Sequence, residues 1–159
     1  MKQTYDKNRV ITSGHGSMLV FNKLVAALTK TGISLMGSRV LSVKGRKSGE
    51  WRSTPVNLMT LDGQPYLVAP RGHVQWVKNL RATPEARLRL GRKTEVFHAV
   101  ELADADKPEV LRVYLKKWSW EVGAFFEGDV DKNSSLETLL QVAPGVPVFK
   151  ITKDAKMGR

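Results

Sequence analysis

The hydrophobic pattern of this chain changes its period near Arg39, and this change limits the folds that the chain can adopt. Between Ser17 and Thr31 apolar residues recur at helical spacing, whereas after Arg39 apolar and polar residues alternate with a period of two. Asp62-Gly63 is a strong signal for a two-residue hairpin, and Pro55 marks a strand edge or a bulge. The predicted strands are 40–44, 56–59, 65–69, 86–90, 94–102 and 146–152.

Helical spacing appears in four places. The first helix follows Ser17 and stops before Gly32; it covers a sheet face or, helped by Lys23 and Lys30, lies on a membrane surface. Others are predicted over 74–82, from a cap at Asp104 or Asp106 onward, and over 136–140. The third helix has an apolar face formed by Val110, Leu111, Tyr114, Leu115 and Trp118. Consecutive hairpins with flanking helices predict an antiparallel barrel of the α+β class.

The length of 159 residues predicts one domain. We expect a flexible N-terminal arm over 1–16, a single domain over 17–152 and a C-terminal tail over 153–159. The chain has no cysteine, which excludes disulfides and thiolate metal sites and fits a reducing compartment. No apolar run approaches the length of a membrane span, so we expect a cytoplasmic protein. A peripheral position on the inner face of the membrane is the open alternative.

The net charge of +11 favours an anionic partner, which is a nucleic acid, an anionic lipid or an acidic small molecule. A barrel that binds single-stranded nucleic acid needs aromatic side chains interleaved with cations on one face. Here the aromatic residues cluster after residue 113, whereas the cations cluster over 44–52 and 71–93. This separation argues against nucleic acid as the partner.

The common catalytic constellations are absent from the sequence. His15, His73 and His98 lack metal-ligand spacing, and no P-loop, Gly-x-Ser-x-Gly elbow or dinucleotide-binding glycine motif occurs. We therefore predict no metal site and assign no catalytic residue. If the protein is an enzyme, a bound cofactor carries the reaction and the chain supplies position and electrostatics.

Two segments are suited to holding an anion. In "VKGRKSGEWRSTPVNLM" a Gly-x-x-x-Gly turn offers backbone N–H groups, and cations and a serine surround it. In "APRGHVQWVKNLRATPEARL" Arg71-Gly72 follows a strand directly, and Trp76, Lys78 and Asn79 fall in the first turns of a helix. The alternative for the first segment is an ordinary solvated hairpin. The alternative for the second segment is that Trp76 plugs the barrel and Lys78 is solvated.

Together, "GRKSGEWRSTPVNL", "YLVAPRGHVQWVKNL" and "VPVFKIT" resemble the deazaflavin-dependent nitroreductase family, over 38–152. The resemblance implies a split β-barrel of the flavin-reductase and pyridoxamine-phosphate-oxidase type. It also implies coenzyme F-420, an 8-hydroxy-5-deazaflavin with a phosphate and an oligoglutamate tail, as the hydride donor; FMN is the less favoured alternative. A small electron-poor acceptor is the implied partner, and a homodimer is compatible with the resemblance.

The resemblance also implies which residues bind the cofactor. The phosphate and glutamates would meet the basic turn, formed by Lys44, Arg46, Lys47, Ser48, Gly49 and Arg52. The strand of Thr54, Pro55, Val56 and Asn57 would run beside the deazaflavin ring. Ala69, Arg71 and Gly72 would back the ring or the tail, and Trp76 with Asn79 would close the site.

The acceptor side departs from the nitroreductase members of the family. The loop over 70–73 is short, and aromatic residues stand after the third helix where those members place tyrosines. Trp120, Phe125 and Phe126 are predicted to wall the acceptor pocket, with an ordinary core role as the alternative. A quinone or enone is therefore favoured over a nitro compound. His73, Tyr114 or solvent would supply the proton. A nucleic-acid-binding barrel and a lipid-binding relative remain the alternative functions.

Overall fold

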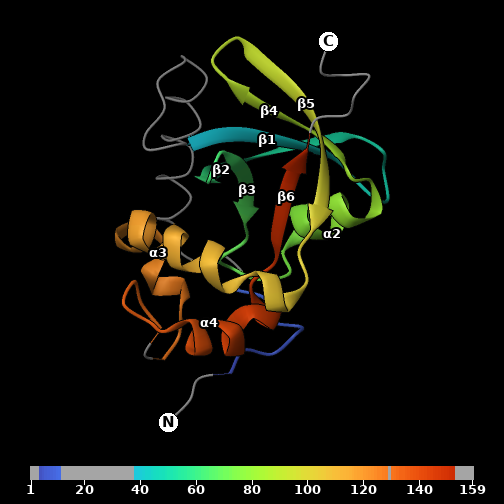
Figure 1. The fold of residues 1–159 in the computed structure, drawn as a ribbon. Helices are drawn as coiled ribbons and strands as arrows, with labels where there is room; N and C mark the ends of the chain where they lie inside the picture. The colour runs from blue at the N-terminus through green and yellow to red at the C-terminus, as the bar shows by residue number, and fades with distance from the viewer. Residues whose placement is uncertain (1–3, 12–37, 129, 153–159) are drawn as a thin grey trace.

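The computed structural model describes residues 4–11, 38–128 and 130–152. Within these residues six strands form a closed antiparallel barrel in the order β1-β2-β3-β6-β5-β4, which confirms the predicted fold class (Figure 1). The strands are β1 Ser38–Lys44, β2 Trp51–Leu61, β3 Gln64–Val68, β4 Glu85–Leu90, β5 Lys93–Glu101 and β6 Val148–Thr152.

The strand β2 is the longest of these, and it pairs with different strands along its length. Residues 51–57 pair with β1, whereas only 58–61 pair with β3. Between β2 and β3 the turn places Asp62 at φ 52° and Gly63 at φ 79°, the left-handed pair that the Asp-Gly signal predicts. On the side facing away from β1, the stretch 51–57 has no strand partner among the described residues. Pro55 lies in this stretch, where its missing N–H removes no bond to β3.

Two hydrophobic clusters form the core. One fills the barrel, where Val77 and Leu80 of α2 (Gln75–Ala82) pack among inward-facing strand residues such as Leu41 and Phe149. The other lies outside the barrel, where α3 (Pro108–Val122) and α4 (Leu136–Val142) pack together, below the barrel in Figure 1. All five residues of the predicted apolar face of α3 are buried.

The start of α3 differs from the prediction. Asp104 and Asp106 form a short 3-10 turn, η1 (Asp104–Asp106), and the helix begins at Pro108 with no side-chain cap. Asp104 instead accepts a hydrogen bond from Lys107 Nζ at 2.8 Å, and the same buried ammonium donates to Ala143 O at 2.8 Å. The pairing satisfies a buried charge, which explains why the carboxylate serves the lysine rather than the helix.

The helix predicted from Ser17 to Thr31 lies outside the described residues. No helix in the described parts of the chain is long and apolar enough to span a bilayer.

Residues 4–11 pack against the barrel and α4, where the sequence led us to expect a loose arm. Tyr5 is buried, its O–H donates to Glu127 O at 3.0 Å, and burial raises its pKa to about 12. The Arg9 guanidinium is also buried and donates to Gly145 O at 2.9 Å and to Phe125 O. Val10 forms an isolated antiparallel bridge with Gly72.

The bridge between Val10 and Gly72 predicts a steric role for this glycine. Gly72 has φ +90°, and a Cβ there would overlap Arg9 O. Gly63 has φ +79° with open space around the same position, so it is a matched control. We expect Gly63→Ala to lower the free energy of unfolding by about 1 kcal/mol, from backbone strain alone. Gly72→Ala should lower it by roughly 1–3 kcal/mol more, from overpacking, as measured by urea denaturation. Equal losses would mean that residues 4–11 do not pack there in solution.

Candidate cofactor site

The turn between β1 and β2 holds its shape through its own polar groups. Gly45 N–H donates to Glu50 O at 2.8 Å, Gly49 N–H donates to Gly45 O at 2.8 Å, and Glu50 N–H donates to Ser48 Oγ at 3.2 Å. Gly49 has φ +73°, a conformation that favours glycine. The predicted basic turn is therefore an ordered hairpin loop that hydrogen bonds among its own backbone and serine groups hold in shape.

The cations of the basic turn are concentrated, and the one carboxylate among them, that of Glu50, forms no ion pair with any of them. Lys44, Arg46, Lys47 and Arg52 are all exposed, and none of them forms a salt bridge with a carboxylate of the described residues. Like charges held this close repel one another and raise the local positive potential. Such an arrangement attracts an anion with several negative groups.

The structure brings the basic turn and the second predicted segment together at one point. Asn79 Oδ1 accepts from Arg46 N–H at 3.1 Å and from Arg46 Nη1 at 2.7 Å. Asn79 is 4% exposed, so its oxygen is a fixed acceptor on α2. These residues are 33 positions apart in the sequence, and both were predicted to contact the cofactor.

Trp76 and Lys78 occupy different environments on α2. The Trp76 ring is half-buried, packs on the core within the barrel and lies 6.0 Å from the Phe149 ring centroid. Lys78 is exposed. This packing agrees with the alternative in which Trp76 plugs the barrel. A contact between the cofactor and the exposed part of the Trp76 ring stays a prediction.

The predicted ring-side strand continues directly from the basic turn. Thr54, Pro55, Val56 and Asn57 are half-buried in β2, along the stretch that pairs with β1 only. Val56 packs against the cluster that fills the barrel. A flat ring placed along this stretch would have an apolar floor and would lie next to the cations of the turn.

Ala69, Arg71 and Gly72 lie against other parts of the chain. Ala69 is buried, and its N–H donates to Pro147 O at 2.9 Å. Arg71 Nε donates to Ile11 O at 2.9 Å, and burial lowers the pKa of the guanidinium, which also lies 6.0 Å from the Phe125 ring centroid. Gly72 lies against the backbone of Arg9. The structure thus joins this loop to the N-terminal segment.

The predicted acceptor wall belongs largely to the core outside the barrel. Phe126 is 5% exposed, and its ring centroid lies 6.4 Å from that of Tyr5. Phe125 ends η2 (Gly123–Phe125) and is half-buried beside Arg71. The side chain of Trp120 lies outside the description. Of the two described rings, that of Phe125 has the more suitable surroundings for a pocket wall.

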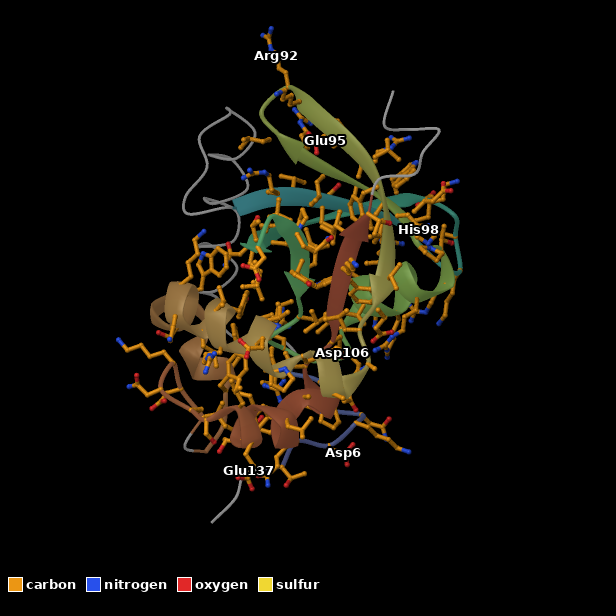
Figure 2. All side chains as sticks on the ribbon, in the orientation of Figure 1. Asp6, Arg92, Glu95, His98, Asp106 and Glu137 are labelled. Atoms are coloured by element: carbon orange, nitrogen blue, oxygen red, sulfur yellow. The ribbon has the colours of Figure 1, made fainter. Side chains whose placement is uncertain are left out.

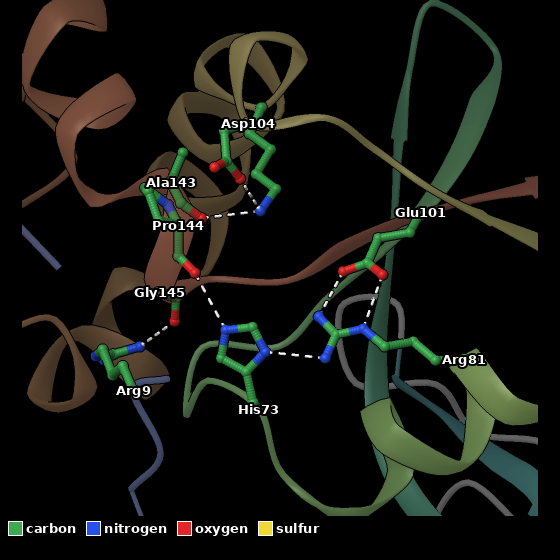
Figure 3. Close-up of polar contacts among 9 residues, drawn as sticks. Arg9, His73, Arg81, Glu101, Asp104, Ala143, Pro144 and Gly145 are labelled. Carbon is green, nitrogen blue, oxygen red and sulfur yellow. Dashed lines mark hydrogen bonds and ion pairs between the residues drawn. The ribbon is translucent and has the colours of Figure 1, made fainter. Parts of the chain in front are cut away.

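His73 is held at both ring nitrogens (Figure 3). Arg81 Nη1 lies 3.0 Å from Nδ1, and since a guanidinium can only donate, Nδ1 accepts. Nε2, 3.1 Å from Pro144 O, is therefore the protonated nitrogen. Arg81 in turn pairs with Glu101 through two bonds of 2.7 and 2.6 Å. His73 therefore acts as a structural link, and Tyr114 is fully enclosed in the core, so neither is placed to give a proton to an acceptor.

No three histidine, aspartate or glutamate side chains of the described residues gather at one place. Figure 2 shows Asp6, Asp106 and Glu137 toward the helical end of the molecule and Glu95 on the β4–β5 hairpin at the other. His98 lies on β5, apart from all of them.

Sequence reasoning missed Tyr5, Arg9 and Arg81 as residues that support the site. Arg9 joins the 72–73 loop, through His73 N–H to Arg9 O at 2.8 Å, to the carbonyls of Phe125 and Gly145. The short N-terminal segment has no apolar periodicity, so the sequence carried no signal of this contact.

The closed antiparallel barrel with flanking helices is the fold of the split-barrel proteins. The chain belongs to the F-420H(2)-dependent quinone reductase family, whose model matches residues 21–122. It is therefore an oxidoreductase that uses reduced coenzyme F-420, as the motifs predicted.

Solved structures of low sequence identity share the fold. The alignment with a protein of unknown function from Agrobacterium tumefaciens has a TM-score of 0.56 and 13% sequence identity, and it covers 92% of this chain and 59% of that protein's chain. The alignment with general stress protein 26 from Bacillus anthracis has a TM-score of 0.51 and 17% identity, and it covers 80% of this chain and 88% of the other. The alignment with a structure described as a domain-swapped dimer has a TM-score of 0.51 and 17% identity, and it covers 85% of this chain and 96% of the other. No curated protein gives a significant match.

The burial of Phe126 predicts how it responds to truncation. If Phe126 belongs to the core, Phe126→Ala should lower the free energy of unfolding by about 3–5 kcal/mol, because it leaves a cavity beside Tyr5. Phe125→Ala, at a half-buried position, should cost clearly less. Thermal and urea denaturation of the two variants makes the comparison. A small loss at Phe126 would instead indicate a ring that faces an open pocket.

Proposed function

We propose that the basic turn binds the phosphate and oligoglutamate tail of coenzyme F-420, and that the deazaflavin ring lies along residues 54–57 of β2. The observation that carries the proposal is the set of four exposed cations without a carboxylate partner on a turn that its backbone already holds in shape. The proposal makes Arg46 and Lys47 tail ligands, with Lys44, Ser48, Gly49 and Arg52 around them.

The donors of the turn fit such a tail chemically. Phosphate and carboxylate groups accept charge-assisted hydrogen bonds, and a guanidinium can bind either in a bidentate manner. Arg46 has five N–H donors on its guanidinium, of which the bond to Asn79 uses one. The remaining donors and the lysines can bind successive carboxylates along an extended chain.

The chain's own residues would position the reaction and shield it. Reduced coenzyme F-420 supplies a hydride. The half-buried strand 54–57 would hold the ring so that the acceptor can approach to roughly 3–3.5 Å. Phe125 would form part of the apolar side that excludes water, and Trp120 is the second candidate for it. A quinone that accepts one hydride needs one proton to become a hydroquinone, and with His73 and Tyr114 both engaged, solvent would supply it.

The cations of the turn should matter for cofactor binding and little for folding. Arg46→Ala with Lys47→Ala should leave the melting temperature of the cofactor-free protein nearly unchanged, because exposed positions usually alter stability by less than about 0.5 kcal/mol. Tailed coenzyme F-420 should bind about ten- to a thousandfold more weakly, from the loss of charge-assisted bonds. A fragment without phosphate and glutamates should bind as before, as fluorescence titration would show. Equal binding of the tailed cofactor by both proteins would contradict the proposal.

The ligand preference separates this function from its rivals. At matched ionic strength we expect tailed coenzyme F-420 to bind more tightly than FMN, and far more tightly than duplex DNA at physiological salt. FMN has a phosphate but no glutamates, so it engages fewer of the cations. Tight DNA binding that falls steeply with salt, without a deazaflavin signal, would favour the nucleic-acid alternative.

We also propose that the chain forms a homodimer, which the similarity to a structure described as a domain-swapped dimer supports. Light scattering after size exclusion should give twice the mass of one chain, about 36 kDa from the 17.8 kDa protomer. A mass of one protomer over micromolar concentrations would refute it.

A further inference from the structure

The contact between Asn79 and Arg46 has a specific chemical character. One amide oxygen accepts two hydrogen bonds from the same residue, at 3.1 Å from the backbone nitrogen and at 2.7 Å from Nη1. The two bonds fix both the backbone at the start of the turn and the direction of the long side chain. Asn79 is buried in α2, so the acceptor itself is fixed.

The acceptor is also neutral. A carboxylate at position 79 would offer equal hydrogen-bonding geometry, but its negative charge would cancel much of the guanidinium charge. Arg81 on the same helix is an arginine whose charge is cancelled in this way, since it donates to the two carboxylate oxygens of Glu101 at 2.7 and 2.6 Å. Arg46 is oriented as Arg81 is, yet it keeps its full charge for another anion.

We infer that Asn79 is a positioning residue, which orients Arg46 toward the anionic tail of the cofactor and leaves its charge uncompensated. This role rests on the proposed function of the basic turn, and it replaces the direct cofactor contact predicted for Asn79. It also makes Asn79 a determinant of specificity, because only a cofactor that carries anionic groups beyond the ring gains from an oriented Arg46.

The test substitutes the acceptor without removing it. Asn79→Asp keeps an oxygen acceptor of the same size and adds one negative charge beside Arg46. We expect tailed coenzyme F-420 to bind roughly five- to fiftyfold more weakly, and its affinity to depend less on salt, while binding of the tailless deazaflavin fragment stays within about twofold. Asn133→Asp makes the same charge change at an exposed position in another turn. It should alter the affinity for either form by less than about twofold.

A double-mutant cycle shows whether Asn79 acts through Arg46. In a chain that already carries Arg46→Ala, adding Asn79→Asp should weaken tailed binding by less than about twofold. Additive losses in the cycle would overturn the inference. Equal losses for the tailed and tailless forms would also overturn it, because they would indicate direct contact with the ring.

Folding is checked by circular dichroism of the cofactor-free variants, with Asn79→Ala as a second substitution. If neither variant folds, Asn79 is a core residue and the inference is wrong. If the unchanged protein binds neither form of the cofactor, the proposed function is wrong. If the unchanged protein binds the tailed cofactor tightly and Asn79→Asp does not change this affinity, the proposed function stands and only the role of Asn79 is wrong.

Discussion

The pairing of β1 with both β2 and β4 is the constraint on which the site depends. Because β1 and β3 both run antiparallel to β2, they point the same way, but β3 ends one residue past the Leu58–Leu67 pair, level with the start of β1. β4 is antiparallel to β1 and begins at the opposite end of β1, where β1 enters the basic turn, with Ala86 opposite Val43. The connection from β3 to β4 must therefore reach the basic turn, and α2 lies in that connection. Asn79 meets Arg46 as a consequence of barrel closure.

The same connection gives α2 two roles that do not compete. Its apolar side, with Val77 and Leu80, fills the end of the barrel and contributes the hydrophobic stabilisation. Its polar side presents Asn79 to the turn and Arg81 to Glu101. The repulsion among the cations of the turn is thus opposed by backbone bonds and by burial of the helix beneath them. The hydrogen bonds and the packing that hold this cluster of charge in place involve no counter-ion.

Local features were predictable from the sequence because local physics produces them. The Asp62-Gly63 turn requires left-handed backbone at both positions, and the spacing of apolar residues in α3 determines its buried face. The family motif was readable because its glycines and cations lie within a few residues of one another. Long-range contacts left no such trace. Nothing near Arg46 in the sequence indicates a partner 33 residues away, and nothing in residues 4–11 indicates burial. The sequence could not decide whether Phe126 lines a pocket or belongs to the core, because an apolar aromatic residue suits either position.

Three arginines illustrate how the surroundings of one side chain type separate structure from function. Arg9 is buried, and carbonyl oxygens of Gly145 and Phe125 surround it, so its donors are used within the fold. Arg81 is compensated by the carboxylate of Glu101, and it also donates a hydrogen bond to His73. Arg46 is exposed and is held by one neutral oxygen, with most of its donors directed to no described group. Holding a charge in place costs conformational entropy, and leaving it uncompensated costs electrostatic energy. Arg46 has both of these energetic costs at the protein surface. Binding of an anionic ligand would offset them, which explains why an ordered and unpaired arginine stands at this position.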